Sequence, residues 1–212
     1  MTTQVKSPFY IVQDFISPLL CEQIVDGLNF IEPDLNSEDQ PILTTKRNDR
    51  FEHVIFQYLQ SQMPDIEEYF NVQYRGTKPV EFNWYPEDYD GDKKITCENS
   101  TYSEKRKVWI KNKDRDLTGI IFLSDFNSKV PFESSYEVYG GKYEFPQHGF
   151  GFNAERGTLI IHPSGPHFLS AVTPVSFGDL FAVKFHIATT VPFMYDPKLF
   201  PGDMRTWFEK IA

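Results

Sequence analysis

Cysteine is scarce in this 212-residue sequence, which contains only Cys21 and Cys97. The two lie far apart in unlike contexts, and they form neither a CxxC pair nor a disulfide framework. Long hydrophobic runs are also absent, since no stretch approaches the roughly 18 apolar residues of a membrane-spanning helix. The opening residues MTTQVKSPFY lack the apolar segment of a signal peptide. We therefore expect a protein of a reducing cytoplasm with no membrane partner.

Basic residues are outnumbered, because 21 Lys and Arg stand against 30 Asp and Glu and give a net charge of −9. A nucleic-acid groove needs clustered cations that displace counterions from phosphates. The sequence has one such cluster, KRKVWIKNKDR at 105–115, and a local charge run of this kind usually lies on a solvated loop. Nucleic acid is therefore not an expected partner.

Aromatic residues, by contrast, are abundant, and 20 Phe with 11 Tyr suit half-buried pleated surfaces better than long helices. Between Tyr139 and Ile187, aromatic and aliphatic residues alternate with polar ones, and glycine or proline interrupts the run at short intervals. This pattern predicts short antiparallel strands of a sandwich or barrel. The same segment carries four of the five histidines, His148, His162, His167 and His186.

The N-terminal part of the chain predicts helices after a short strand over 9–15. Ser17 is a typical N-cap, and Pro18 fits the first helical position. Apolar residues at helical spacing predict an amphipathic helix over 18–29 and a second over about 48–62, with a further turn or two over 64–70.

From residue 80 the hydrophobic period changes to two, which predicts strands. The predicted strands cover 80–85, 94–102, 107–111, 117–122, 142–145, 157–162, 167–173 and 180–187. Helices followed by short strands predict an α+β, mainly β, fold: a double-stranded β-helix, or jelly-roll barrel, with the N-terminal helices packed on one face. Residues 1–78 would form this support, 79–190 the jelly-roll core of the same domain, and 191–212 a tail with a short helix.

Six fragments occur in an informative order along residues 8–188. They are FYIVQDFISPLLCEQIV, Asn83-Trp84-Tyr85, LTGIIFLSD at 117–125, GGKYEFP at 140–146, RGTLII at 156–161 and Pro166-His167. Together they resemble the iron- and 2-oxoglutarate-dependent dioxygenases, in particular the prolyl-4-hydroxylase-like branch found in bacteriophage genomes.

The resemblance implies an Fe(II)- and 2-oxoglutarate-dependent hydroxylase of a peptidyl or amino-acid side chain, with ascorbate as an accessory reductant. In such enzymes two histidines and one carboxylate hold Fe(II) and leave positions open for 2-oxoglutarate and oxygen. By position, His167 and Glu98 would bind iron. Lys184, Asn83 and Tyr85 would bind 2-oxoglutarate, whose far carboxylate needs a buried cation.

The chain departs from the family's pattern where the first two ligands, His-x-Asp, belong. That place is occupied by Thr96-Cys97-Glu98, so the carboxylate is kept while a hydroxyl stands in place of the imidazole. A neutral hydroxyl is a poor ligand for Fe(II). Either the site is lost, or another group replaces the metal in function, or Glu98 and His167 form a non-standard site. Water, Cys97 or another histidine, such as His162 or His186, would complete that site.

A second alignment, anchored on VTPV at 172–175, places Ser170 where the distal histidine belongs and Leu180 where the basic residue belongs. The alignment on His167 is preferred here because it keeps a histidine and gives Lys184 a role. Two residues also have plain structural interpretations. His162 precedes a proline and is expected to bond a backbone carbonyl, and Cys97 is expected to be a small buried residue.

Two classes of function follow. The first is a 2-oxoglutarate-dependent dioxygenase. The second is a non-catalytic jelly-roll homologue, a phage structural or interaction protein that has lost the iron site. A cupin-like metal enzyme is a weaker third, because it would need three or four inward histidines close together.

Overall fold

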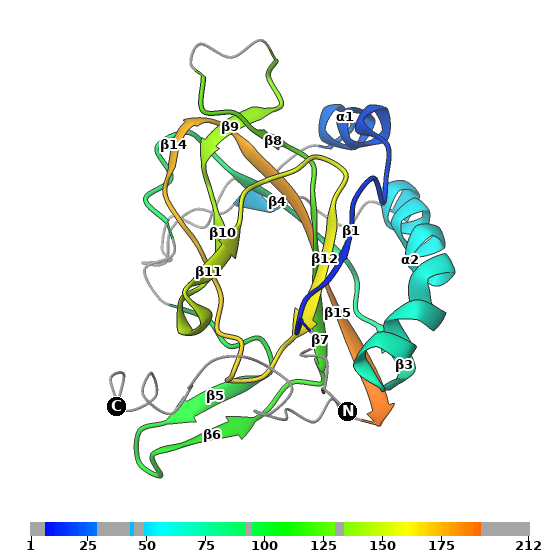
Figure 1. The fold of residues 1–212 in the computed structure, drawn as a ribbon, viewed down its shortest axis with the longest axis vertical. Coiled ribbons are helices and arrows are strands. Elements are labelled where there is room, and N and C mark those ends of the chain that lie inside the picture. The colour runs from blue at the N-terminus through cyan, green and yellow to red at the C-terminus, as the bar shows by residue number, and fades with distance from the viewer. Residues whose placement is uncertain (1–6, 29–42, 45–48, 92–94, 130–133, 192–212) are drawn as a thin grey trace, which may run out of the picture.

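The computed structural model describes residues 7–28, 43–44, 49–91, 95–129 and 134–191. Within these residues the protein is mainly β, with two α-helices that pack side by side on one side of the molecule (Figure 1). The tail beyond Val191, with its predicted helix around Met204–Ile211, lies outside the described residues. The described helices are too short or too polar to cross a membrane.

Helix α1 (Pro18–Asp26) confirms the first predicted helix, although it ends three residues earlier than expected. The side chain of Ser17 accepts a hydrogen bond from the Leu20 amide at 3.2 Å, which satisfies one of the free N–H groups of the first turn. Cys21 and Ile24 point into the core from this helix.

Helix α2 (Asp49–Phe70) joins the second predicted helix and the following turns into one element of 22 residues. It passes through Pro64, which has no backbone N–H to donate and lies on the exposed side of the helix. Met63, directly before the proline, is part of the buried stripe, and Ile66 and Phe70 continue it beyond the proline. Burial of this stripe therefore outweighs the unfavourable helix propensity of one proline.

The strands are short, apart from the last. They are β1 (Tyr10–Val12), β2 (Leu43–Thr44), β3 (Gln73–Thr77), β4 (Glu81–Tyr85), β5 (Ser100–Ser103), β6 (Val108–Lys111), β7 (Leu117–Phe122), β8 (Asp125–Phe126), β9 (Glu137–Gly140), β10 (Tyr143–Phe145), β11 (Phe150–Phe152), β12 (Leu159–Pro163), β13 (Ala171–Val172), β14 (Val175–Gly178) and β15 (Leu180–Val191). A 3₁₀ turn, η1 (Pro146–His148), separates β10 from β11.

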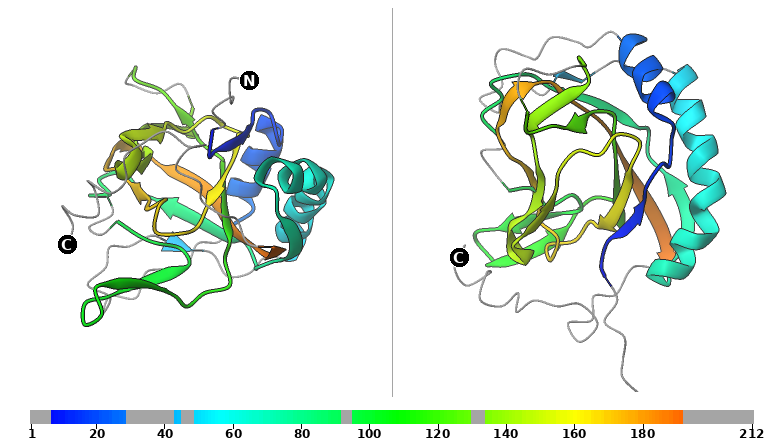
Figure 2. Two further views of the ribbon diagram at one scale, coloured as in Figure 1. Left: turned by 60° about the horizontal axis from the view of Figure 1, so that its bottom comes forward. Right: turned by 45° about the horizontal axis from the view of Figure 1, so that its top comes forward.

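One large antiparallel sheet organises the molecule, in the order β1-β12-β7-β15-β4-β2, with β3 paired to the far end of β15. The two helices cover its outer face, and the small sheets β11-β10-β13 and β14-β9-β8 face its other side (Figure 2). The predicted strands at 80–85, 117–122 and 180–187 are confirmed at its centre, whereas the strand predicted at 167–173 is reduced to β13. Hairpin β5–β6 projects from one end of the barrel (Figure 1).

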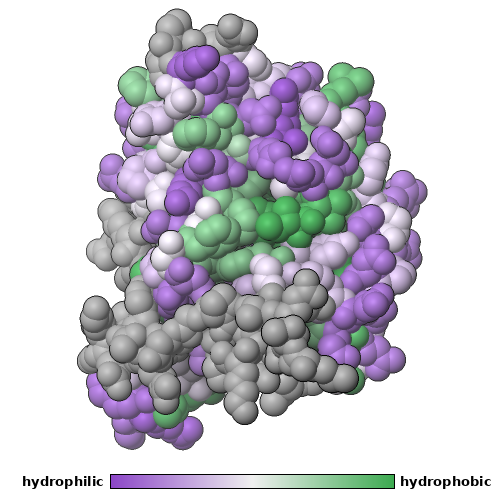
Figure 3. Space-filling view, in the orientation of Figure 1, coloured by the Kyte–Doolittle hydropathy of each residue, from purple (hydrophilic) through white to green (hydrophobic). Residues whose placement is uncertain are grey.

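Strand β15 separates two hydrophobic cores by simple alternation. Phe181, Val183, Phe185 and Ile187 pack under the helices. Leu180 and Ala182 point the other way, into the barrel between the large and small sheets. Phe9 joins this second core and lies against the rings of Phe145, Phe150 and Phe152. On the face seen in Figure 1, apolar side chains gather near the centre, within a hydrophilic surround (Figure 3).

Gly119, in the middle of β7, tests this packing. A methyl group at this position would overlap the ring of Phe185 on the neighbouring strand, whereas a methyl group at Gly76 in β3 would meet no atom. We expect Gly119→Ala to lower the free energy of unfolding by about 1–3 kcal/mol, the usual effect of overpacking a core. Gly76→Ala is the matched control and should change it by less than about 0.5 kcal/mol. Equal effects in urea unfolding would contradict the described contact between β7 and β15.

Candidate functional site

The inward face of the barrel changes from apolar to polar along β15. After Leu180 and Ala182, the same face presents Lys184 and His186. In the sheet, His186 is paired with Thr118 of β7, and Thr118 is paired with His162 of β12. Residues paired directly across antiparallel strands project to the same side, so these side chains form one polar layer at one end of the barrel.

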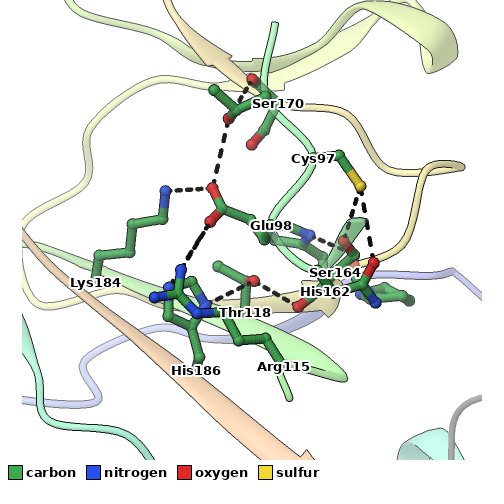
Figure 4. Close-up of polar contacts among 12 residues, drawn as sticks. Cys97, Glu98, Arg115, Thr118, His162, Ser164, Ser170, Lys184 and His186 are labelled. Carbon is green, nitrogen blue, oxygen red and sulfur yellow. Dashed lines mark hydrogen bonds and ion pairs between the residues drawn. The ribbon is translucent and has the colours of Figure 1, made fainter. Parts of the chain in front are cut away.

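Glu98 enters this layer from the connection that precedes β5. Its approach is fixed by a two-bond bridge, in which Thr96 N donates to Ser170 O at 2.9 Å and Ser170 N donates to Thr96 O at 3.1 Å. Backbone alternation then sends the side chains of Thr96 and Glu98 to one side and that of Cys97 to the other. The Cys97 thiol lies 3.6 Å from the Ser164 carbonyl oxygen and points away from Glu98 (Figure 4).

Three basic side chains surround the Glu98 carboxylate (Figure 4). Lys184 Nζ donates to Oε1 at 2.5 Å, while Arg115 Nη1 lies 3.6 Å and His186 Nε2 lies 3.8 Å from Oε2. The side chain of Glu98 is 7% exposed and that of His186 is 1% exposed, whereas Lys184 and Arg115 retain 20% and 25%. Glu98 and His186 are thus shielded from solvent inside the barrel, and the cluster reaches solvent past Arg115 and Lys184.

The two histidines of the layer differ in how their ring nitrogens are hydrogen-bonded. His162 Nδ1 donates to the Pro163 carbonyl at 2.8 Å, so its Nε2 accepts from the Tyr143 hydroxyl at 3.0 Å. Both nitrogens are therefore used, which confirms the expected bond to a backbone carbonyl. His186 Nδ1 lies 3.1 Å from the hydroxyl of Thr118, while its Nε2 has no hydrogen-bond partner in the described part of the chain.

Burial and charge together set the protonation states of the layer. Burial alone raises the pKa of Glu98, but the charge of Lys184, which also donates a hydrogen bond to the carboxylate, outweighs it and lowers the pKa to about 2. Burial lowers the pKa of Lys184, and Glu98 more than restores it, so the ammonium stays charged. Desolvation lowers the pKa of His162 to about 4 and that of His186 to about 3. At neutral pH both imidazoles are neutral.

Of the predicted site residues, Glu98 and Lys184 are in direct contact and form an ion pair with each other. Asn83 and Tyr85 are buried on β4, opposite Ala182 and Leu180 in register, and so line the same inward face.

His167 is half-buried in the connection between β12 and β13. Its carbonyl oxygen accepts a hydrogen bond from His148 Nε2 at 2.9 Å, and burial together with His148 lowers the pKa of its ring. The residue directly opposite Thr96 is Ser170, three positions further along. This pairing agrees with the second alignment of the sequence.

The donor set does not fit Fe(II). Thr96 and Ser170 offer hydroxyls, which are poor ligands for this ion, and the carboxylate of Glu98 is held by an ammonium. In the described ranges, no three His, Cys, Asp or Glu side chains are grouped so that they could hold a metal ion. The far carboxylate of 2-oxoglutarate is poorly provided for as well, because Lys184 is committed to Glu98 and Leu180 is fully buried among apolar residues.

Arg115 was not among the residues predicted for the site, because the sequence places it at the end of a basic run that resembles a solvated loop. The hairpin β5–β6 carries the chain back so that Arg115 stands next to Glu98 at the entrance to β7. One feature of the sequence could have indicated that Arg115 lies near the site. It comes two residues before the most apolar predicted strand, at 117–122.

In fold, the chain is similar to prolyl hydroxylases, which are 2-oxoglutarate-dependent dioxygenases. One such structure is the viral collagen prolyl hydroxylase of Paramecium bursaria Chlorella virus-1 in complex with 2-oxoglutarate, with a TM-score of 0.60, 16% identity, and coverage of 85% of this chain and 96% of that chain. A Pseudomonas putida prolyl-4-hydroxylase gives a TM-score of 0.55 and 12% identity over 86% and 92% of the two chains.

A Trichoplax adhaerens prolyl hydroxylase, solved with a hypoxia-inducible-factor peptide fragment, gives a TM-score of 0.55 and 15% identity over 86% and 84% of the two chains. Comparisons with protein-family models and with curated protein sequences find no match. At these identities the likeness establishes the fold, and the function must be argued from the site.

The contact between Lys184 and Glu98 predicts a large effect on stability. Lys184→Met removes the cation in direct contact with the buried Glu98 carboxylate and should lower the free energy of unfolding by about 3–5 kcal/mol. The double variant Lys184→Met/Glu98→Gln should recover part of this loss, because no uncompensated charge remains. Lys107→Met, which removes an exposed lysine from the hairpin tip, should leave the urea midpoint unchanged. A Lys184 variant as stable as the control would contradict the described pair.

Acid should destabilise the protein through the same layer. Because His162 and His186 have pKa values below the ordinary 6.5, the unfolded state binds more protons than the folded state below that pH. Stability should therefore fall as the pH drops from about 6.5 towards 4, and Glu98 adds to the loss below its ordinary 4.5. His186→Gln should flatten this dependence in urea unfolding. An unchanged slope in the His186 variant would count against a neutral, buried His186.

Proposed function

We propose that this chain is a prolyl-hydroxylase-fold protein that binds its ligand without oxidising it. The observation that carries the proposal is the ammonium of Lys184, which lies on the one carboxylate of the predicted iron site at 2.5 Å. An ammonium supplies a fixed positive charge but no coordination position, so oxygen and 2-oxoglutarate would have nothing to bind to. The protein therefore matches the non-catalytic jelly-roll homologue that the sequence offers as its alternative.

The pairing of Thr96 with Ser170 supports the proposal. Two ligands of one metal ion on neighbouring strands must project to the same side, as directly opposed residues do. With Ser170 at the distal position, both histidines of the triad are replaced by hydroxyls, and Leu180 replaces the basic residue. The ion pair then takes over from the metal the role of neutralising Glu98.

The finer structural and biological assignments belong to the same proposal. We infer that the sheets form a double-stranded β-helix, which the similarity to prolyl hydroxylases supports. A peptide is a reasonable ligand class, because the Trichoplax enzyme was solved with a peptide fragment. The phage origin and the cytoplasmic location stay predictions.

Anaerobic addition of Fe(II) and 2-oxoglutarate tests the proposal. We expect no visible metal-to-ligand charge-transfer band from the wild-type protein, and no succinate after admission of air. The control is Thr96→His/Ser170→His/Lys184→Met, which supplies two imidazoles and frees the carboxylate of Glu98. Provided that it stays folded, this variant should gain metal binding, measured as a thermal shift with Mn(II). A charge-transfer band from the wild-type protein would establish an oxygenase and overturn the proposal.

A further inference from the structure

Three aromatic rings form a row on the outer face of the small sheet β14-β9-β8. The Tyr139 ring lies between those of Phe126 and Phe177, with its centroid 5.9 Å and 6.3 Å from theirs. Tyr139 and Phe177 are paired directly across β9 and β14. They are 38% and 44% exposed, whereas Val138 and Val175 of the same strands are buried in the barrel core. The sheet therefore has a second, outward apolar surface that no element of the described ranges covers.

This aromatic row lies at the opposite end of the barrel from the polar layer. In Figure 1 the sheet β14-β9-β8 is at the top of the view, whereas hairpin β5–β6, which follows Glu98, is at the bottom. The inward residues Leu180 and Ala182 of β15 belong to the same apolar core as Val138 beneath the row. The role of the row is therefore independent of what the polar layer binds.

The charges next to the aromatic row are negative. Glu87 Oε2 accepts a hydrogen bond at 3.1 Å from the amide of Gly178, which directly follows Phe177. Asp179 Oδ1 in turn accepts one from the Glu87 amide at 3.1 Å, and neither carboxylate has a Lys, Arg or His partner among the described residues. Strands β8, β9 and β14 contain no Lys or Arg, and Lys129 is the only such residue in the sequence from 117 to 141. The row is thus flanked by fixed negative charge, which favours a positively charged ligand.

An arginine of this chain shows the expected kind of contact close to the row. The Arg156 guanidinium carbon lies 5.8 Å from the centre of the ring of Tyr136, the residue directly before β9. Arg156 Nη1 also lies 2.8 Å from Glu22 Oε1, and its Nε lies 3.3 Å from Asp125 Oδ2. A guanidinium between a ring face and carboxylates combines cation–π attraction with ion pairing. The aromatic row offers rings and carboxylates in the same way, but its three strands supply no arginine.

The spacing of the rings indicates the form of the ligand. Side chains on one side of an extended peptide are two residues apart, which is about 6.6 Å. The centroid spacings of 5.9 Å and 6.3 Å are close to this repeat, so cations at alternate positions of an extended segment can lie on successive rings. Arginine suits this arrangement better than lysine, because its planar guanidinium stacks on rings and keeps N–H donors for Glu87 and Asp179.

We propose that the aromatic row and its flanking carboxylates are a docking surface for an extended segment of a partner protein with arginine at alternate positions. The surface consists of Phe126, Tyr139, Phe177, Glu87 and Asp179. The arginines stack on the rings, and those next to Phe177 pair with the two carboxylates. A neutral sugar would gain nothing from these charges, and a nucleic acid would be repelled by them. The inference goes beyond the proposed function and does not depend on it.

The test is a titration of ¹³C-labelled wild-type protein at low and at high salt, followed by the NMR signals of the Tyr139 and Phe177 rings. The probes are the peptide Ac-Arg-Ser-Arg-Ser-Arg-NH₂, its lysine counterpart, its citrulline counterpart, which keeps the shape of arginine without the charge, and cellotriose. We expect saturable shifts with the arginine peptide that weaken at high salt, weaker shifts with the lysine peptide, and none with citrulline or cellotriose. Ac-Arg-Arg-Arg-Ser-Ser-NH₂ should bind at least about twofold more weakly than the alternating peptide, because fewer of its cations reach rings together.

Variants separate this surface from exposed rings and charges elsewhere. Phe177→Leu keeps an apolar side chain but removes a ring, and should weaken binding of the arginine peptide about two- to fivefold. Phe150→Leu is the matched control, because this ring is 43% exposed but lies on β11, outside the row, and it should leave binding unchanged. Glu87→Gln should weaken binding and reduce its salt dependence, whereas Glu68→Gln, on the exposed side of α2, should do neither. Urea midpoints of the four variants show whether each remains folded.

The inference is overturned if no peptide shifts the two ring signals, or if the citrulline peptide shifts them as strongly as the arginine peptide. Saturable binding of cellotriose in place of the arginine peptide would identify a carbohydrate site and overturn it as well. Ring signals that shift with the concentration of the protein alone would show that a second copy covers the row, which also contradicts the inference. None of these results affects the Fe(II) test of the proposed function, which concerns the opposite end of the barrel.

Discussion

A carboxylate taken out of water needs positive partners, and the rest of this site follows from that constraint on Glu98. The bridge between Thr96 and Ser170 holds Glu98 in the barrel, where its side chain is almost fully buried. Lys184 contacts it directly, and Arg115 and His186 approach its second oxygen. Removal of Glu98 or of Lys184 would leave the charge of the other uncompensated in a buried site. The two residues therefore depend on each other.

The long strand β15 explains how one element serves both the fold and the site. Its odd-numbered residues from Phe181 to Ile187 pack under the two helices, and its even-numbered residues line the barrel. The inward series begins with apolar residues and ends with Lys184 and His186. The inward face of β15 is therefore apolar at Leu180 and Ala182 and polar at Lys184 and His186, and the polar end reaches solvent past Arg115.

Local patterns allowed much of the fold to be predicted. Ser17 and Pro18 mark the start of α1, period-two alternation marks β4 and the first part of β15, and an apolar run marks β7. Alternation also places Lys184 and His186 on one face. The continuation of α2 through Pro64 was harder to predict from the sequence, because it depends on the burial of the helix against the sheet beneath it.

The site was harder to predict, because its contacts join residues far apart in the chain. The sequence identifies Glu98 and Lys184 as site residues, but as separate ligands of iron and of 2-oxoglutarate, and it gives no sign that they lie 2.5 Å apart. The pairing of Ser170 with Thr96, three residues away from His167, depends on the path of the connection before β13. Arg115 reaches Glu98 only because hairpin β5–β6 reverses the chain.

The direct partner of Glu98 is a lysine ammonium rather than a metal ion. Paramagnetic NMR with Mn(II), which replaces Fe(II) in oxygen-rich sites, measures this directly. The predicted result is that Mn(II) causes no selective broadening of the signals of Thr96, Glu98 and Ser170 and leaves the Glu98 carboxyl titrating with a pKa of about 2. Broadening centred on these three residues, with release of the Lys184 ammonium, would contradict the account.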